Sequence, residues 1–153
     1  MGLKQVKSLF QVSTIPYFSG GDTEVNTRPG RTTQVKLKVD NIRISNDKRN
    51  VLVGVDFHII EVASNHTHLR FLGEHRIPLP NSWKHKNVKI GGEARGLNLT
   101  QSIAGKQHNW IDIAIDDEET VVEDAMIKID GPGNNDDENA ELELIFKIPI
   151  VVT

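Results

Sequence analysis

The sequence contains no cysteine, few aromatic residues and no long uninterrupted apolar run. The missing cysteine excludes disulfide bonds and thiolate metal sites. It is neutral about the cellular compartment, because a chain of 153 residues can bury a sufficient core without bridges. Phe, Trp and Tyr together make up 5% of the chain, so the core has to be built mainly from Ile, Val and Leu.

Signals for export or membrane attachment are also missing from the sequence. The N-terminal residues lack the apolar stretch of a signal peptide, and no segment has the length and apolarity of a membrane-spanning helix. Val6 occupies the position where a myristoylation motif requires Ser or Thr. We therefore expect a protein that is cytoplasmic when synthesised and has no membrane partner, with signal-independent export left open.

The sequence lacks the motifs of common catalytic sites. It has no nucleophile elbow, no cysteine nucleophile and no Gly-rich phosphate loop that opens a helix. We therefore predict a non-enzymatic protein.

The net charge of −3 conceals an uneven distribution along the chain. Between Asp112 and Glu143 there are thirteen acidic residues and one basic residue, a net charge of −12, whereas the remainder carries eight acidic and seventeen basic residues, a net charge of +9. The basic residues are scattered, without an Arg-rich cluster or an aromatic stacking platform, so nucleic acid is not an expected partner. Complementary acidic and basic surfaces would instead allow a homo-oligomer.

The stretch from Val51 to Val62 predicts the central strand of the fold. Its apolar residues fall at every second position, which places them on one face of a β-strand, opposite Gly54, Asp56 and His58. The alternating residues are Val51, Val53, Val55, Phe57 and Ile59. After Ile59 the apolar phase shifts by one residue, so we expect a β-bulge there.

The same period predicts further strands over residues 32–44, 69–79, 88–90, 97–99, 110–116, 125–129 and 142–152. A phase change near Asp40 predicts a bend in the first of these, and a polar turn is expected from Ser64 to His68. Pro149 lacks a ladder donor, which favours an edge position for the last strand. We expect Val53, Val55, Phe57, Ile113, Leu144 and Phe146 to be almost fully buried.

This pattern predicts an all-β fold. We expect a two-sheet antiparallel sandwich of Greek-key or jelly-roll type with seven or eight strands, and a closed β-barrel is the alternative. Residues 1–31 form an N-terminal arm with room for one edge strand, and residues 32–153 form a single β-sandwich domain.

His66 and His68 are followed by Glu74, and this order resembles the first motif of the cupins, in which an HxH pair precedes a glutamate. The resemblance implies a metal held by imidazole and carboxylate ligands. Five residues separate His68 from Glu74 here, and the alternative interpretation is a solvated polar turn.

Two acidic segments offer oxygen ligands for Ca²⁺, which binds carboxylates and carbonyls on flexible loops. The candidate ligands are Asp116, Asp117, Glu118, Asp136, Asp137 and Glu138. The second segment resembles the aspartate-rich loop of calcium-mediated bacterial lectins. The alternative is that both are ordinary solvated loops.

Two tryptophans complete the set of candidate residues. Trp83 is a candidate for stacking on a sugar ring, whereas Trp110 adjoins an apolar strand and is expected to be partly in the core.

The leading functional hypothesis is a non-enzymatic β-sandwich module that recognises a protein or carbohydrate ligand through its loops, with calcium as a candidate cofactor. The first alternative is a self-assembling structural protein, such as a shell, tube or capsid-like component. The second is a cupin-like metal enzyme.

Overall fold

The computed structural model describes residues 2–14, 32–61, 66–92, 94–104, 110–115, 119–130 and 139–153. Within these ranges the chain forms nine strands and one short 3-10 helix: β1 (Gly2–Thr14), β2 (Thr32–Ile44), β3 (Asn50–Glu61), β4 (His66–Pro78), η1 (Asn81–Trp83), β5 (Val88–Ile90), β6 (Leu97–Ala104), β7 (Ile111–Asp112), β8 (Val122–Asp130) and β9 (Asn139–Val152). No helix in these ranges has the length and apolarity needed to cross a membrane.

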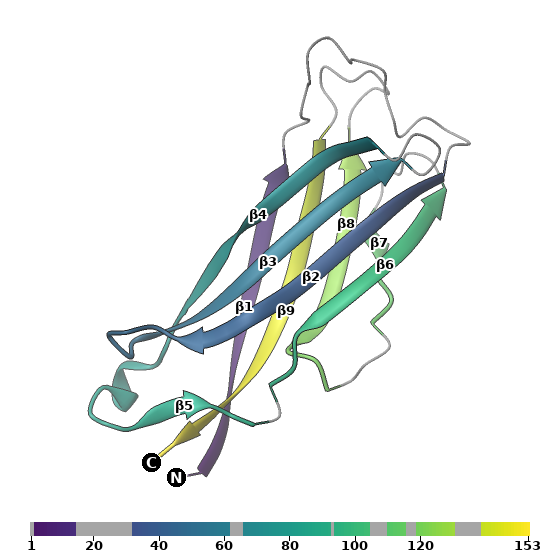
Figure 1. Ribbon diagram of the computed structural model, residues 1–153. Coiled ribbons are helices and arrows are strands. Elements are labelled where there is room, and N and C mark those ends of the chain that lie inside the picture. The colour runs from purple at the N-terminus through teal and green to yellow at the C-terminus, as the bar shows by residue number, and fades with distance from the viewer. Residues whose placement is uncertain are drawn as a thin grey trace.

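The strands form two antiparallel sheets that pack against each other (Figure 1). The four-stranded sheet has the order β4-β3-β2-β6. The five-stranded sheet has the order β1-β9-β8-β7, with β5 paired to β9. The sheets stay separate, so the fold is a sandwich, as predicted, and not a closed barrel. In the four-stranded sheet, β6 returns beside the first strand of the β2-β3-β4 meander, which is a Greek-key arrangement.

The prediction for the central strand is confirmed. β3 lies between β2 and β4, and its five alternating apolar residues are at most 1% exposed. The ladder between β3 and β4 shifts register between Ile59 and Ile60, but the unpaired residue is His68 of β4 and β3 stays in register with β2 through Glu61, so the bulge predicted in β3 lies in its partner strand. Both sides of the shift remain buried, since Ile60 is 8% exposed.

The predicted bend in β2 is also present. The ladder between β2 and β3 shifts register between Asp40 and Arg43, and Asn41 adopts a positive φ of 53° there. Asparagine tolerates this left-handed conformation better than most residues. The bend lets β2 and β3 pair as one hairpin along their whole length.

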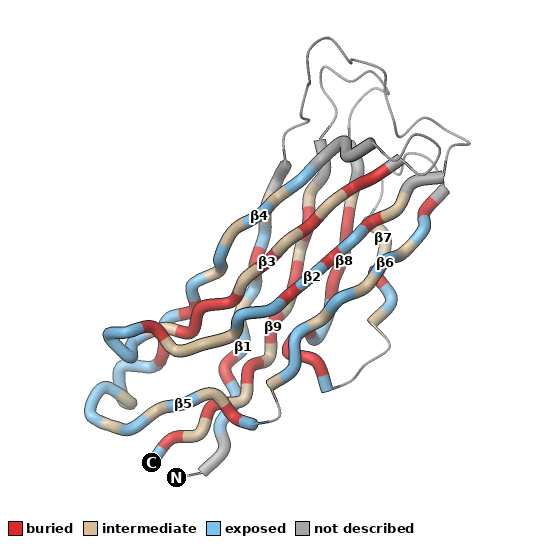
Figure 2. Tube along the Cα trace, in the orientation of Figure 1, coloured by how far each residue is buried: buried red, intermediate tan, exposed pale blue. Residues whose placement is uncertain are grey.

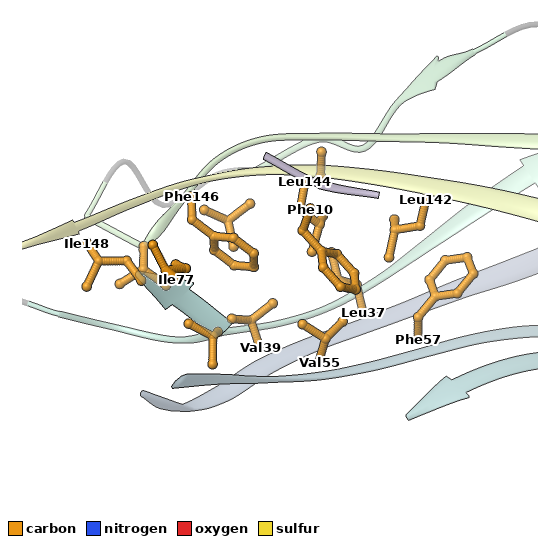
Figure 3. Packing of buried hydrophobic residues seen from close by; sticks show 14 of the residues in the cluster. Phe10, Leu37, Val39, Val55, Phe57, Ile77, Leu142, Leu144, Phe146 and Ile148 are labelled. Carbon is orange, nitrogen blue, oxygen red and sulfur yellow. The ribbon is translucent and has the colours of Figure 1, made fainter. Parts of the chain in front are cut away.

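The core lies between the sheets, and its residues alternate along the strands with exposed or half-buried ones (Figure 2). Figure 3 shows Phe10 and Phe146 from the five-stranded sheet facing Val39, Val55 and Leu37 from the four-stranded sheet. All six residues predicted to be almost fully buried are at most 3% exposed. The strand count is higher than predicted because β1 is a full strand with thirteen residues.

The edge position predicted for β9 from Pro149 is wrong, because β9 pairs with β1 on one side and with β8 and β5 on the other. The Lys147 N–H donates to the Val121 carbonyl (2.7 Å), and the Pro149 carbonyl accepts from the Gly91 N–H (2.8 Å). The backbone groups of both residues therefore point away from β1. Pro149 therefore lies in the gap between the β8 and β5 ladders, and the β1 ladder loses no donor there.

Three local predictions also need correction. β4 begins at His66, so His66 to His68 are strand and not turn. β6 extends to Ala104, whereas β7 covers only two residues of the strand predicted over residues 110–116. Trp110 is 39% exposed and not a core residue.

Candidate functional site

The outer face of the four-stranded sheet carries a set of charged side chains from three neighbouring strands. Alternate residues of β2, β3 and β4 point away from the core, and these positions hold five basic and three acidic residues together with His58. We call this surface the charged face: Lys36, Lys38, Asp40, Arg43, Asp56, His58, Arg70, Glu74 and Arg76.

The centre of the charged face is set by the register of three strands. His58 lies between Lys36 on β2 and Arg70 on β4, and Asp56 lies opposite Lys38 in the next row. Directly opposed side chains on one face lie roughly 5 Å apart at Cβ. The register therefore places four nitrogen-bearing side chains around one carboxylate.

Asp56 holds two of its neighbours by electrostatic attraction. Its Oδ1 lies 2.8 Å from His58 Nε2 and 3.5 Å from Arg70 Nε. These are ion-pair distances, but Oδ1 is buried and no described donor N–H is aligned with it as a hydrogen bond. A buried carboxylate oxygen without a hydrogen bond is costly. Asp56 is therefore placed to orient the side chains of His58 and Arg70, and it is too covered to contact a ligand through Oδ1.

A groove of about 390 Å³ runs beside this centre and is lined by Lys38, Asp40, Gly54, Asp56, Leu72 and Glu74. Gly54 forms its floor, and a Cβ at this position would lie 3.1 Å from Asp40 Oδ1 and 3.2 Å from the Asp40 carbonyl. A second depression of about 150 Å³ lies between Lys36, His58 and Asn98. Lys38 therefore stands between the two hollows, and Lys36 borders the second one.

One end of the charged face is occupied by an internal ion pair. Arg43 contacts Glu74 through a short guanidinium–carboxylate interaction, and Arg43 and Arg76 flank Leu52 in the register. Leu52 points outward but is only 8% exposed, which is consistent with coverage by the aliphatic stems of these arginines. Lys36 and Lys38 are both exposed, as are Arg70 and Arg76, and Lys38 Nζ lies 3.5 Å from Asp40 Oδ2.

Ion pairs inside the molecule partly offset the charge division seen in the sequence. Lys7 on β1 pairs with Glu123 (3.3 Å), and Arg95 pairs with Glu119 (3.2 Å). Each pair joins the basic remainder of the chain to the acidic segment. The fold thus brings some basic residues next to residues of the acidic segment. The charged face still has more basic than acidic groups.

Among the predicted metal ligands, the structure describes the side chain of Glu74 only. Asp116, Asp117, Glu118, Asp136, Asp137 and Glu138 lie outside the described residues, as do the side chains of His66 and His68. Glu74 lies on the same strand as the two histidines, six residues beyond His68, which corresponds to roughly 20 Å of extended chain. The strand does not bring Glu74 to this pair, and Glu74 contacts Arg43 instead. In the described part of the chain, no group of three His, Asp or Glu residues could hold a metal ion.

The two tryptophans lie in different settings. Trp83 belongs to η1, packs partly on the core and lines a cleft of about 170 Å³ together with Lys48, Arg49, Pro78, Pro80 and Lys84. Trp110 lies at the start of β7, with Lys128 Nζ 6.0 Å from its ring centroid. Trp83 therefore has a cleft beside it, as a ligand-stacking residue requires, although only part of its ring is exposed.

No family model, no curated protein and no solved structure matches this chain. The charged face therefore has to be interpreted from its own chemistry.

The sequence contained part of the signal for the charged face. The outward phase of Lys36, Lys38, Asp56 and His58 follows directly from strand alternation. Their grouping depends on which residue of one strand faces which residue of the next, and a single sequence does not specify that register in ladders that contain register shifts.

Proposed function

We propose that this protein is a non-enzymatic β-sandwich binding module that holds an extended acidic segment of a protein partner on the charged face. The observation that supports the proposal best is the pair of exposed lysines: Lys38 stands between two hollows on the sheet, and Lys36 borders one of them.

The spacing of these lysines suits a partner in extended conformation. Residues two apart on a strand lie roughly 7 Å apart on the same face, and alternate side chains of an extended peptide have the same spacing. A segment with carboxylates at every second position would present one to each lysine. Such charge-assisted contacts favour specificity and association rate.

The mixed charge of the face favours a protein over a nucleic acid. Asp40, Asp56 and Glu74 alternate with the basic groups and would repel a continuous phosphate backbone. Apart from the half-buried imidazole of His58 beside Asp56, the described residues of this face offer no aromatic ring on which a base or a sugar could stack. The partner class is therefore acidic and peptidic.

The test uses two fluorescein-labelled peptides of equal composition, one with alternating Glu and Ser and one with Glu and Ser in separate blocks. Fluorescence anisotropy should show tighter binding of the alternating peptide. The Lys36→Glu/Lys38→Glu variant should bind it roughly tenfold or more weakly. The matched control is Lys84→Glu/Lys89→Glu, which makes the same charge change at exposed positions outside the charged face. Equal losses for both variants, or equal binding of both peptides, would show that the face does not recognise such a segment.

Ligand recognition through the loops, as expected from the sequence, is supported by a separate observation. The described strand ends at Thr14, Thr32, Glu61, His66 and Ala104 share one end of the sandwich, as do those at Asp130 and Asn139 (Figure 1). Recognition elements are common at the loop-bearing ends of β-sandwiches. If calcium assists there, millimolar Ca²⁺ should raise the melting temperature, and Asp136→Asn should reduce that rise. An unchanged melting temperature with calcium and with a chelator would remove calcium from the proposal.

Self-assembly is the second candidate function. It is supported by two long strands, β1 and β4, that lie at sheet edges.

A further inference from the structure

One side of the sandwich exposes the edges of both sheets. Among the described residues, the backbone of β1 pairs only with β9, and the backbone of β4 only with β3. Each has thirteen residues. Figure 1 shows both strands on the same side of the molecule, and Phe10 of β1 contacts Phe71 of β4 with ring centroids 5.7 Å apart.

The hydrogen bonds of the neighbouring strands show which backbone groups point outward from this edge. In an antiparallel sheet, the N–H and C=O of one residue point to the same side, and successive residues alternate. The backbone N–H and C=O of Lys147 point toward β8, so those of Ile148 point toward β1. Val6 is paired with Ile148, and its backbone groups point toward β9. The groups of Lys7, Leu9 and Gln11 therefore point away from the sheet.

The same reasoning applies to β4. The Leu79 N–H donates to the Arg49 carbonyl (2.8 Å), so the odd-numbered residues of β4 point toward β3. The backbone groups of Arg70, Leu72, Glu74 and Arg76 point toward the open edge. Both edges thus present a row of donors and acceptors that could pair with another strand.

An exposed leucine marks the middle of each edge. Leu72 is 66% exposed and Leu9 is 51% exposed, and they are the two most exposed large apolar residues in the described chain. They lie at the same level, because their neighbours Phe71 and Phe10 are in contact. They are on opposite outer faces, so each sheet has one apolar side chain beside its open edge.

We propose that a second copy of this chain pairs along this edge about a two-fold axis that passes beside Leu9 and Leu72. In this arrangement β1 pairs antiparallel with β1 of the second copy, and β4 with β4, so that both sheets become continuous across the dimer. A two-fold interface must be self-complementary, and the sequence of each strand meets that condition about its leucine.

The charges select this register on β4. With Leu72 opposite Leu72 of the second copy, Arg70 lies opposite Glu74 of the second copy, and the same contact occurs twice because of the symmetry. Opposite charges in direct cross-strand pairs are favourable, and like charges are unfavourable. A shift of the axis to Glu74 would oppose two glutamates.

The register on β1 follows the same rule. With Leu9 opposite Leu9 of the second copy, Lys7 lies opposite Gln11, whose side chain already donates to Glu143 (2.9 Å). An axis at Lys7 would oppose two lysines. On the inner face Val6 would lie opposite Val12 of the second copy, which continues the apolar core across the axis.

The two proposals depend on different key residues: peptide binding depends on Lys36 and Lys38 of β2, in the interior of the sheet, and the dimer depends on the edge strands, although Arg70 and Glu74 of β4 also belong to the charged face. Failure of one proposal therefore leaves the other testable by its own variants.

Sedimentation equilibrium of the full chain over a wide concentration range tests the proposal. The wild type should show a monomer–dimer equilibrium. Leu9→Lys and Leu72→Lys should each weaken dimerisation roughly tenfold or more, because each places two ammonium groups across the axis. Thr100→Lys is the matched control, since it adds a lysine to an exposed position on β6, at the other edge of the four-stranded sheet, and should dimerise like the wild type.

A charge exchange identifies the register. Arg70→Glu and Glu74→Arg should each favour the monomer, and the double variant should recover the dimer, because the exchange restores both cross-axis pairs. A wild type that is monomeric at every concentration, or a dimer that none of the edge variants weakens, would overturn the proposal. Failure of the double variant to recover would overturn the register about Leu72.

Discussion

The two edges of the sandwich are closed in different ways. At the edge where β6 meets β7, side chains bond to backbone: the Gln101 amide donates to the Asp112 carbonyl (3.2 Å) and accepts from the Ala114 N–H (2.8 Å). At the edge where β1 meets β4, side chains contact side chains. Ser8 Oγ lies 2.8 Å from His75 Nε2, and Phe10 packs on Phe71.

The difference concerns which backbone groups stay open for pairing. The first kind of closure occupies the Asp112 C=O and the Ala114 N–H, which are two of the groups that another strand would need. The second kind covers the core and leaves the backbone of both edge strands open. A sandwich can therefore seal its interior on two sides and still present one side to a second strand.

The largest expected effect is on the β1/β4 edge. Phe10 is 8% exposed and contacts the rings of Phe71, His75 and Phe146. Phe10→Ala should lower the free energy of unfolding by about 3 kcal/mol, because it removes the aromatic contact between the two sheets. Urea unfolding measures this value. A loss below about 1 kcal/mol would mean that β1 is not packed on β4.

The next effect concerns the β6/β7 edge, where the backbone before β6 approaches β2 closely. A Cβ added at Gly96 would lie 2.1 Å from the Val39 carbonyl oxygen, so the backbone would have to move. Gly96→Ala should therefore destabilise the protein by about 1–3 kcal/mol. The control is Gly92→Ala, because a Cβ there meets no atom within 4 Å. Equal unfolding midpoints for the two variants would contradict the close approach.

A smaller effect is expected when the side-chain closure of this edge is removed. Gln101→Ala removes both hydrogen bonds to residues 112 and 114 and should lower stability by about 1 kcal/mol. The neighbouring substitution Ser102→Ala alters an exposed side chain on the other face of β6 and should change stability by less than about 0.5 kcal/mol. The difference in unfolding free energy between the two variants measures how much the Gln101 hydrogen bonds stabilise this edge.

The stability contributed by the β1/β4 edge should also depend on pH, because His75 lies there. Burial lowers the pKa of His75 below its usual value of 6.5. The unfolded chain therefore binds a proton at this residue before the folded one does, and stability falls as the pH drops through about 6.5. Denaturant unfolding between about pH 7.5 and 5.5 should show a larger loss in the wild type than in His75→Gln. Parallel pH profiles for the two proteins would exclude this role for His75.

The strand positions could be predicted from the sequence because alternation depends on neighbouring residues alone. The bend near Asp40 in β2 is a case in which a change of apolar phase indicates a change of register. The edge position predicted for β9 was wrong because it depends on residues that are distant in the sequence. Whether Pro149 disrupts a ladder depends on which strands lie opposite it, and these come from distant parts of the chain.

The candidate site was predictable to a smaller extent. Outward-pointing Lys36 and Lys38 followed from the period of β2, but their position beside Asp56 and His58 depends on cross-strand register. The grouping of His66 and His68 with Glu74 assumed a turn where the chain continues as a strand. Metal sites on loops depend on the path of the loop, which residue spacing alone does not determine.

The most direct test of this account is residue-resolved amide hydrogen exchange along β1. At low protein concentration, Val6, Ser8 and Phe10 should exchange slowly because their N–H groups point toward β9, whereas Lys7, Leu9 and Gln11 should exchange quickly. At high concentration these three should become protected as the second copy pairs with them. Uniformly fast exchange along β1 at every concentration would contradict the account, because it would mean that residues 2–14 are an undocked arm and not the edge strand of a sheet.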